Sequence, residues 1–544
     1  MIRARHVLSL ASAGILIASL AACGENARDA DTSGSGSGDG DSAGAAASGE
    51  WTLGTTETVT AMDPAGSYDF GSWNMQYNIF EQLVTIPAGE SEPVDDAASC
   101  AYDDPTTLTC TLKEGLTFSN GDELTSSDVL YSFKRNLEIN DPNGSSVLLG
   151  SISNGDSENQ TLAEGAIETP DDLTVVFHLN QADQTFLKIL SSATSSIVDE
   201  EVFPADALLG DADVIGSGPY TLAGYDPGKQ ATLIANTAYD GDRAPQTKQI
   251  FVQYFNDPAP LRNAIASEQI DIAWRTLSPT DLNSLEDEGT VDVIKGEGSE
   301  FRYWVWQLDA GAGGDKAVRQ AAAQLIDRDA ITENAYDGTV APSYSIVPPG
   351  LGGQKDSFQE KYGDPSVDAA KQILSDAGIK TPVKITLGYT PTHYGPNAVD
   401  EANEFAGQLN DSGLFDVKLA DAEWEEYQDL YKQNAYDLFI LGWYPDFLDA
   451  DNYLTPFVRD GGFFANGYSN DEVNSLLDQA LGETDEAARA DEIGQLQDIV
   501  AEDVPLIPSW NGQNVAVATD KMSGVEETLD PTYIFRFWGI TKSE

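Results

Sequence analysis

The sequence predicts a mixed α/β protein with more than one hydrophobic core. Beyond Gly296, helical patterns alternate with apolar β-runs, which is typical of helices that cross over a sheet. Before that point, short β-prone runs are separated by turn residues. The chain has 544 residues, of which 41% are hydrophobic, and this is enough for two or three cores.

The individual elements follow from periodicity and turn chemistry. In the first half we expect a strand at Trp51–Gly54, a helix around Asn78–Glu81, a helix entered at Thr125–Asp128, a buried strand at Val175–Leu179 and a hairpin across Tyr220–Ala235. In the second half we expect helices at 317–323, 366–377 and 401–409, buried strands at 383–387 and 436–442, and a return of β character from Val515.

The first residues have the layout of a secretion signal. Arg3 and Arg5 precede an apolar run from Val7 to Leu20, and the segment ends in Leu-Ala-Ala-Cys at Cys23. This ending resembles the bacterial lipobox, so we expect residues 1–22 to be a signal peptide and Cys23 to be the lipidated residue. A membrane-spanning helix is the alternative, but the apolar run is shorter than the roughly 18 residues that such a helix needs.

The spacer that follows, residues 23–49, is dominated by Gly, Ser, Ala and Asp in its longer part. This composition cannot bury apolar surface, so we expect a flexible segment. The folded body would then be lipid-anchored to the outer face of the cell membrane.

The charge of the chain excludes several partners. Its 90 acidic residues exceed its 29 basic residues, giving a net charge of −61, and no basic cluster is present. Nucleic acid and anionic lipid are therefore not expected as partners.

The few cysteines and histidines limit which disulfide, metal and catalytic sites the chain can form. Cys100 and Cys110 flank turn residues between two β-prone runs, and outside the cytoplasm we expect them to form a disulfide across a hairpin. A metal site is the alternative, but no histidine lies near. His178 and His393 lie in no catalytic or zinc motif, so we expect no enzyme, cofactor or metal. Hydrolysis by carboxylates alone needs no histidine and stays open as a remote alternative.

Six groups of short motifs occur in an order that resembles one family across nearly the whole chain after the signal. They are Met62-Asp63-Pro64 with Ile79-Phe80-Glu81, Leu112–Gly121 with Thr125–Val129, Gly216–Tyr220, Val318–Ala321 with Ile326–Arg328, Ala369–Lys371 with Leu374–Gly378, and Gly442-Trp443 with Asp446, Asp451 and Asn452. The family is that of the large extracytoplasmic solute-binding proteins of peptide and nickel ABC importers.

The resemblance implies a two-lobed periplasmic-binding-protein type II fold. Its first lobe carries an extra subdomain, and two crossovers, here near 294–300 and 508–514, join the lobes. Mapped onto this chain, lobe I is 50–296 plus 512–544, with the extra subdomain at about 84–208, and lobe II is 297–511. The resemblance also implies a monomer that encloses its ligand between the lobes and presents the closed form to a membrane permease.

The resemblance implies one specific ligand contact. In peptide-binding members the acidic residue after the Gly-Trp pair holds the α-ammonium of the ligand, and Asp446 occupies that place. The alternative is that Asp446, with Asp449 and Asp451, is only a polar loop or helix cap. A calcium loop is a third possibility, but the spacing lacks the glycine and terminal glutamate of an EF-hand.

The other expected cleft residues follow from their position: Tyr68, Phe70, Gly71, Gly442, Trp443, Trp510 and Asn511. Each aromatic residue could instead be ordinary core. The sequence identifies no basic partner for a peptide carboxylate, and Arg302 is a bare hypothesis. We expect peptides, in particular oligopeptides, as cargo; oligosaccharides are the alternative, because nine tryptophans could supply stacking faces, and nickel is less expected.

Overall fold

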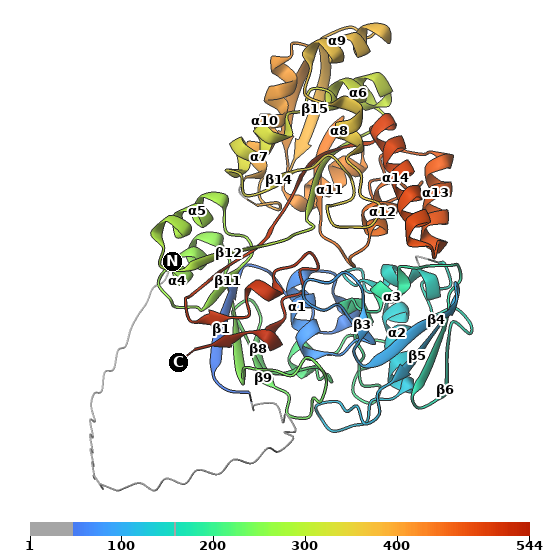
Figure 1. The fold of residues 1–544 in the computed structure, drawn as a ribbon, viewed down its shortest axis with the longest axis vertical. Coiled ribbons are helices and arrows are strands. Elements are labelled where there is room, and N and C mark those ends of the chain that lie inside the picture. Colours follow the sequence, from blue (N-terminus) through green and yellow to red (C-terminus); the bar gives the residue numbers. More distant parts are fainter. Residues whose placement is uncertain (1–46, 157–158, 396, 544) are drawn as a thin grey trace, which may run out of the picture. The chain divides into compact units, whose positions relative to one another are not determined.

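The computed structural model describes residues 47–156, 159–395 and 397–543. The predicted signal peptide, Cys23 and nearly all of the spacer lie outside these residues. The described residues belong to one compact unit, which contains three larger sheets (Figure 1). In that part, no helix is both long and apolar enough to cross a membrane.

Lobe I is built around a seven-stranded sheet. Its strands, in spatial order, are β12 (Asp292–Gly296), β19 (Asn514–Ala518), β11 (Ile272–Trp274), β1 (Glu50–Thr55), β10 (Gln249–Tyr254), β9 (Gln230–Ala235) and β8 (Tyr220–Asp226). β1 runs parallel to β10 and β11, and the pairs Trp51–Ile250 and Leu53–Val252 are buried in register. Helices α4 (Pro258–Ala266) and α5 (Pro279–Glu288) belong to this lobe. The hairpin predicted for Tyr220–Ala235 is confirmed as β8 and β9.

Lobe II is built around a six-stranded sheet. Its strands, in spatial order, are β14 (Ala341–Pro342), β18 (Leu506–Asn511), β13 (Phe301–Trp306), β17 (Leu438–Trp443), β15 (Val383–Tyr389) and β16 (Phe415–Asp421). Its helices are α6 (Lys316–Ala323), α7 (Arg328–Tyr336), α8 (Ser357–Tyr362), α9 (Val367–Asp376), α10 (Ala398–Asp411), α11 (Trp424–Lys432), α12 (Thr455–Val458), α13 (Asp471–Gly482) and α14 (Glu486–Asp503). All six residues of β13 are buried, and all but Arg302 are apolar or aromatic. The helices and strands predicted for this half are all present.

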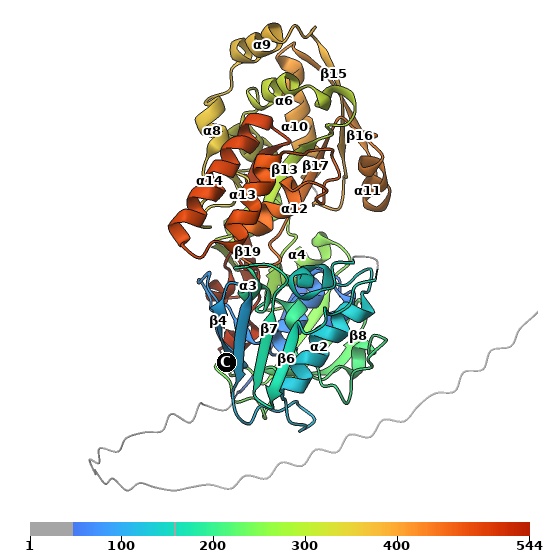
Figure 2. The same cartoon turned by 90° about the vertical axis from the view of Figure 1, so that its right-hand side faces the viewer.

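The small subdomain is built around a four-stranded sheet. Its strands are β4 (Ala98–Asp104), β5 (Thr107–Leu112), β7 (Thr174–His178) and β6 (Ile167–Asp171), with α2 (Ser126–Ile139) beside β6 and β7 (Figure 2). Thr125 and Asp128 form a capping box at the start of α2, as the sequence predicts. The predicted cysteine hairpin is β4 and β5, and a disulfide joins Cys100 to Cys110 on directly paired positions. Helix α3 (Phe186–Ile189) completes this part.

The remaining described elements are short. The two-stranded pairs are β2 (Val84–Thr85) with β3 (Val94–Asp95) and β20 (Met522–Ser523) with β21 (Thr541–Lys542). The 3-10 turns are η1 (Pro64–Gly66), η2 (Ser146–Ile152), η3 (Ala193–Ser195), η4 (Asp211–Asp213), η5 (Gly311–Gly314), η6 (Ala450–Tyr453), η7 (Glu526–Thr528) and η8 (Phe537–Gly539).

The chain crosses from one large sheet to the other twice. It leaves β12 at Gly296 and enters β13 at Phe301, and it leaves β18 at Asn511 and enters β19 at Asn514. Both passages fall within the crossovers predicted near 294–300 and 508–514.

One helix lies elsewhere than the sequence predicts. The helix expected around Asn78–Glu81 is α1 (Phe70–Ile79), and Phe80 is already extended. The Asp69 side chain accepts a hydrogen bond from the Ser72 N–H and begins the helix ten residues before its end. The prediction followed the apolar residues and missed this cap.

Candidate functional site

Two neighbouring cavities carry most of the predicted site residues. The aspartate cavity, of about 790 Å³, contains Asp446 in its wall, and the arginine cavity, of about 680 Å³, contains Arg275 and Arg302. Both cavities are lined by Tyr68, Asp69, Phe70, Gly442, Trp443, Tyr444 and Phe463. These shared residues come from the segment that begins α1, from the end of β17 and the residue after it, and from the segment that follows α12. The two cavities therefore share a wall, and we treat them together as the candidate site.

Asp446 is positioned by Asn452. The Asp446 N–H donates to Asn452 Oδ1 at 3.0 Å, and Asn452 Nδ2 donates to Asp446 Oδ2 at 2.9 Å. The same Asn452 Oδ1 accepts from Trp443 Nε1 at 2.9 Å, so one amide fixes both the tryptophan and the aspartate. Burial raises the pKa of Asp446 to about 6, although Asn452 and the Tyr68 hydroxyl each lower it.

The neighbouring aspartates have different surroundings. Asp449 accepts from Arg489 at 2.6 and 3.0 Å and lies 3.2 Å from Lys188 Nζ. Burial raises the pKa of Asp449, but Arg489 and Lys188 outweigh burial and hold the pKa below its usual range. Asp451 accepts from Thr455, and burial raises its pKa to about 7. Within the described residues, Asp446 forms no ion pair.

Arg302 is a buried cation with unused donors. Its Nη2 donates to Glu300 Oε1 at 2.9 Å, whereas Nε and Nη1 have no hydrogen-bond partner among the described residues. The guanidinium lies over the rings of Tyr394, at 4.0 Å, and Trp510, at 4.9 Å. Burial alone would lower the pKa of Arg302, but nearby groups, Glu300 first, raise it and keep the side chain charged.

Arg275, which follows β11 in lobe I, has similar surroundings: a carboxylate partner, aromatic rings and, among the described residues, an unpaired nitrogen. It lies 3.0 Å from Glu57 Oε1, and its Nη1 has no partner among the described residues. Its guanidinium lies 4.4 Å from the centre of the Tyr444 ring and 5.0 Å from that of Phe70. Its φ of 67° is in the left-handed region, and the next residue, Thr276, has φ of 66°. Non-glycine residues held in this region are characteristic of functional sites.

The comparisons with known proteins identify the family. Residues 96–465 match the bacterial extracellular solute-binding proteins, family 5. The chain belongs to this family. This confirms the resemblance drawn from the six groups of motifs.

Individual family 5 relatives cover most of the chain. The oligopeptide-binding protein OppA of Bacillus subtilis strain 168 is 27% identical over 488 residues, which is 86% of this chain and 88% of the relative. The probable D,D-dipeptide-binding periplasmic protein DdpA of Escherichia coli K12 is 26% identical, covering 84% of this chain and 87% of the relative. The solved ABC transporter substrate-binding protein CtaP of Listeria monocytogenes has a TM-score of 0.79 at 21% identity, covering 92% of this chain and all of that one. This structural likeness confirms the predicted two-lobed α/β fold.

The structure brings some of the predicted site residues together and not others. Tyr68, Phe70, Gly442, Trp443, Trp510 and Asp446 each line at least one cavity. Gly71 and Asn511 line neither cavity. A Cβ on Gly71 would lie 2.0 Å from the Thr58 carbonyl oxygen, so Gly71 allows close backbone packing, and Asn511 Nδ2 donates to the Glu300 carbonyl at 3.2 Å. Both residues therefore contribute to the packing around the site and do not line it.

Trp510 is held by a buried carboxylate that sequence analysis did not identify. Glu401, on α10, accepts from Trp510 Nε1 at 3.0 Å, Tyr336 Oη at 2.7 Å and Ser509 Oγ at 2.9 Å. Burial raises the pKa of Glu401 even though Arg302 lowers it. Since a glutamate inside an amphipathic helix looks like surface in the sequence, no local signal marks it.

His393, which lies in no catalytic or zinc motif, also lines the site. His393 stacks on Trp424 at 3.7 Å with nearly parallel rings, and both residues line the arginine cavity. Burial lowers the pKa of His393 to about 4, and Arg302 adds to this effect. The side chain is therefore neutral at pH 7.

Proposed function

We propose that this protein captures peptides and delivers them to the permease of an ABC importer. The observation that carries the proposal is the carboxylate of Asp446, which faces a large cavity and has no ion-pair partner among the described residues. A partly buried anion of this kind favours a ligand that supplies the positive charge, and a peptide supplies it as the α-ammonium. The names of the relatives OppA and DdpA, which refer to oligopeptides and D,D-dipeptides, support the same cargo class.

The arginine cavity supports a ligand with charge at both ends. Arg302 has two buried nitrogen atoms, Nε and Nη1, without partners among the described residues, and such donors are costly unless a ligand or water binds them. A peptide carboxylate, or an acidic side chain, would bind there. This gives the hypothesis about Arg302 a physical reason that the sequence did not supply.

Capture would involve closure of the two lobes. We propose the lobe boundaries given above, 50–296 plus 512–544 and 297–511 with the small subdomain at about 84–208, with the ligand enclosed between them. No bond is made or broken. We also propose that Cys23 carries the lipid anchor, that the spacer lets the monomeric body move over the outer face of the membrane, and that the permease binds the closed form.

The test is calorimetric titration of the purified protein with tripeptides and with their N-acetylated counterparts. We expect Asp446→Asn to weaken binding of free-amine peptides by about 2–5 kcal/mol, because the buried ammonium loses its partner. Asp451→Asn, in the same cavity wall, is the matched control and should have the smaller effect. Equal affinity of the wild-type protein for free and acetylated peptides would rule out the role of Asp446.

An oligosaccharide is the second candidate cargo. Tyr68 stacks on Trp73 at 5.6 Å, and both residues line the aspartate cavity, where a sugar ring could pack on them. Titration with cello- and xylo-oligosaccharides beside the peptides separates the two cargo classes.

A further inference from the structure

Exposed apolar side chains gather at the aspartate cavity. The described residues contain six exposed large apolar side chains: Tyr68, Val94, Val147, Ile234, Val367 and Phe463. Three of the six, Tyr68, Val147 and Phe463, line this one cavity, with exposed fractions of 39%, 66% and 47%. Single exposed apolar residues need no explanation, but a group that shares one concave surface indicates a binding site.

The three residues come from three separate parts of the fold. Tyr68 precedes α1 in lobe I, Val147 belongs to η2 in the small subdomain, and Phe463 follows α12 in lobe II. Phe463 packs edge-on against Trp443 at 5.7 Å, and Tyr68 stacks on Trp73. Val147 is the most exposed of the three, although it lies beside the buried Leu149 in the same turn. No local feature of the sequence requires these three residues to meet. The tertiary fold brings their apolar side chains to one cavity.

The ionisable side chains of the same cavity are almost all acidic. Five carboxylates line it, against a single guanidinium, that of Arg459: Asp69, Asp183, Asp446, Asp451 and Asp460. Arg459 already pairs with Asp478 outside the cavity, and none of the five carboxylates forms an ion pair within the described part of the chain. An additional anion in this space would be repelled, and a cation would be attracted.

We propose that the aspartate cavity selects ligands in which a large uncharged apolar side chain lies beside a free ammonium group, and that it rejects an acidic side chain at that place. Val147 and Phe463 are specificity-determining residues, because a large apolar side chain of the ligand would cover their exposed surfaces. This inference rests on the proposed function and names the class of first residue that the peptide carries.

The test compares three tripeptides by calorimetry on the same protein: Phe-Ala-Ala, Gly-Ala-Ala and Glu-Ala-Ala. With the wild-type protein we expect the first to bind at least about tenfold more tightly than the second, since a large apolar side chain leaves water. We expect the third to bind at least about tenfold more weakly than the second. Val147→Ser and Phe463→Ala should each reduce the ratio of the first two affinities about fivefold.

The matched control is Val367→Ser, which changes an exposed valine on α9 that lines neither cavity, with an exposed fraction of 47%. It should leave all three affinities unchanged. Binding of all three tripeptides with equal affinity, or an unchanged ratio in both cavity variants, would overturn this inference and leave the proposed function standing. Absence of binding for all three tripeptides would overturn both.

Discussion

At the scale of single residues, three aspartates within one short segment have different surroundings. Asp449 is neutralised by Lys188 and Arg489 and stabilises the loop, whereas Asp446 faces the cavity with only hydrogen-bond donors around it. Burial without a cation raises the pKa of Asp446 to about 6, and burial with two cations leaves the pKa of Asp449 below its usual range. Asp446 is therefore a carboxylate whose ionised form would be stabilised by a cationic ligand.

Peptide affinity should depend on pH through this carboxylate. The charged ammonium binds the ionised form of Asp446, so affinity should fall as the pH drops through about 6, approaching tenfold per pH unit, and should also fall above about pH 8, where the peptide amine loses its proton. Asp451, with a pKa of about 7 in the same cavity, adds a smaller decline that begins at higher pH. Calorimetry between pH 5 and pH 8 measures the profile. Asp446→Asn should remove most of the decline near pH 6, and an unchanged profile in this variant would contradict the assignment.

Gly442 should be required for the position of Arg302. The two residues are paired across β13 and β17, and a Cβ on Gly442 would lie 2.5 Å from Arg302 Nη1. We expect Gly442→Ala to reduce the free energy of unfolding by about 1–3 kcal/mol, because the guanidinium must move from between two rings. Urea titration measures the change. Gly407→Ala is the matched control, since its Cβ meets no atom within 4 Å and alanine favours the helix α10.

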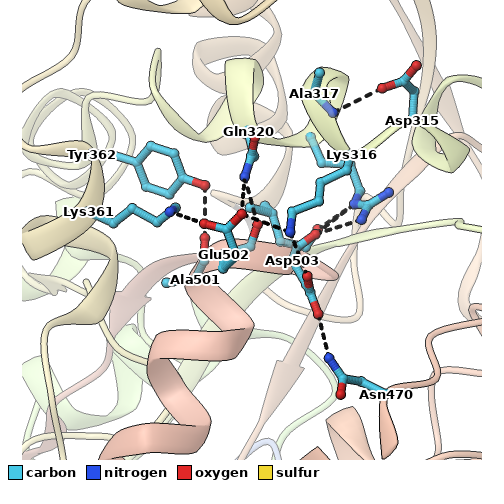
Figure 3. A network of polar contacts seen from close by, with 12 residues as sticks. Asp315, Lys316, Ala317, Gln320, Lys361, Tyr362, Asn470, Ala501, Glu502 and Asp503 are labelled. Carbon is cyan, nitrogen blue, oxygen red and sulfur yellow. Dashed lines mark hydrogen bonds and ion pairs between the residues drawn. The ribbon is translucent and has the colours of Figure 1, made fainter. Parts of the chain in front are cut away.

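At the scale of elements, the C-terminal end of α14 joins several helices of lobe II. Glu502 accepts from Lys316 at 2.8 Å and also pairs with Lys361, which connects α14 to α6 and α8 (Figure 3). Asp503 accepts from Asn470, the residue that caps α13, at 2.9 Å. These contacts fix α13 and α14 side by side (Figure 2).

This network should make lobe II sensitive to acid. Lys316 and Lys361 lower the pKa of Glu502 to about 2, so the stability it contributes is fully present above about pH 4.5 and is lost as the pH falls toward 2. Glu502→Gln should abolish this part of the acid transition, measured as the melting temperature between pH 2 and pH 6. Glu425→Gln, on the exposed side of α11, should leave the transition unchanged. Equal effects of both variants would show that the network has no specific role.

At the scale of the whole molecule, the loop after β17 contacts all three parts of the fold. Tyr444 packs on Phe70 at 5.2 Å and on Tyr533 at 5.1 Å in lobe I, and Phe447 is buried in the core of the small subdomain. Asp449 pairs with Lys188 of α3 and with Arg489 of α14. The loop that carries Asp446 is therefore positioned by residues outside the lobe to which its strand belongs.

Breaking these contacts should reduce stability in a graded order. Asp449→Asn leaves Arg489 without a carboxylate partner among the described residues, while Lys188 keeps Glu92 at 3.0 Å, and should cost about 3–5 kcal/mol of the free energy of unfolding. Lys188→Met leaves Asp449 paired with Arg489 and should cost about 1–3 kcal/mol. The control Lys134→Met removes an exposed pair with Glu138 and should cost less than about 1 kcal/mol. Chemical denaturation gives the three values, and an inverted order would contradict this account.

Much of the fold could be predicted from the sequence, because its signals are local. Turn residues between β-prone runs predicted the cysteine hairpin, and the Thr125–Asp128 pattern predicted the start of α2. The order of the motifs predicted the family and both crossovers. The start of α1 was missed because its signal is a single capping aspartate, Asp69.

The sequence by itself determined the elements, the family and a short list of site residues, including the Gly-Trp-x-x-Asp segment ending at Asp446. Only the tertiary structure decided which of the three aspartates is paired with cations, because Lys188 and Arg489 reach Asp449 from distant elements. The structure also decided that Val147 and Phe463 share a cavity and that Gly71 and Asn511 do not line it. The physical reason is that periodicity and capping act over a few residues, whereas burial and charge pairing depend on which distant side chains the packed core brings together.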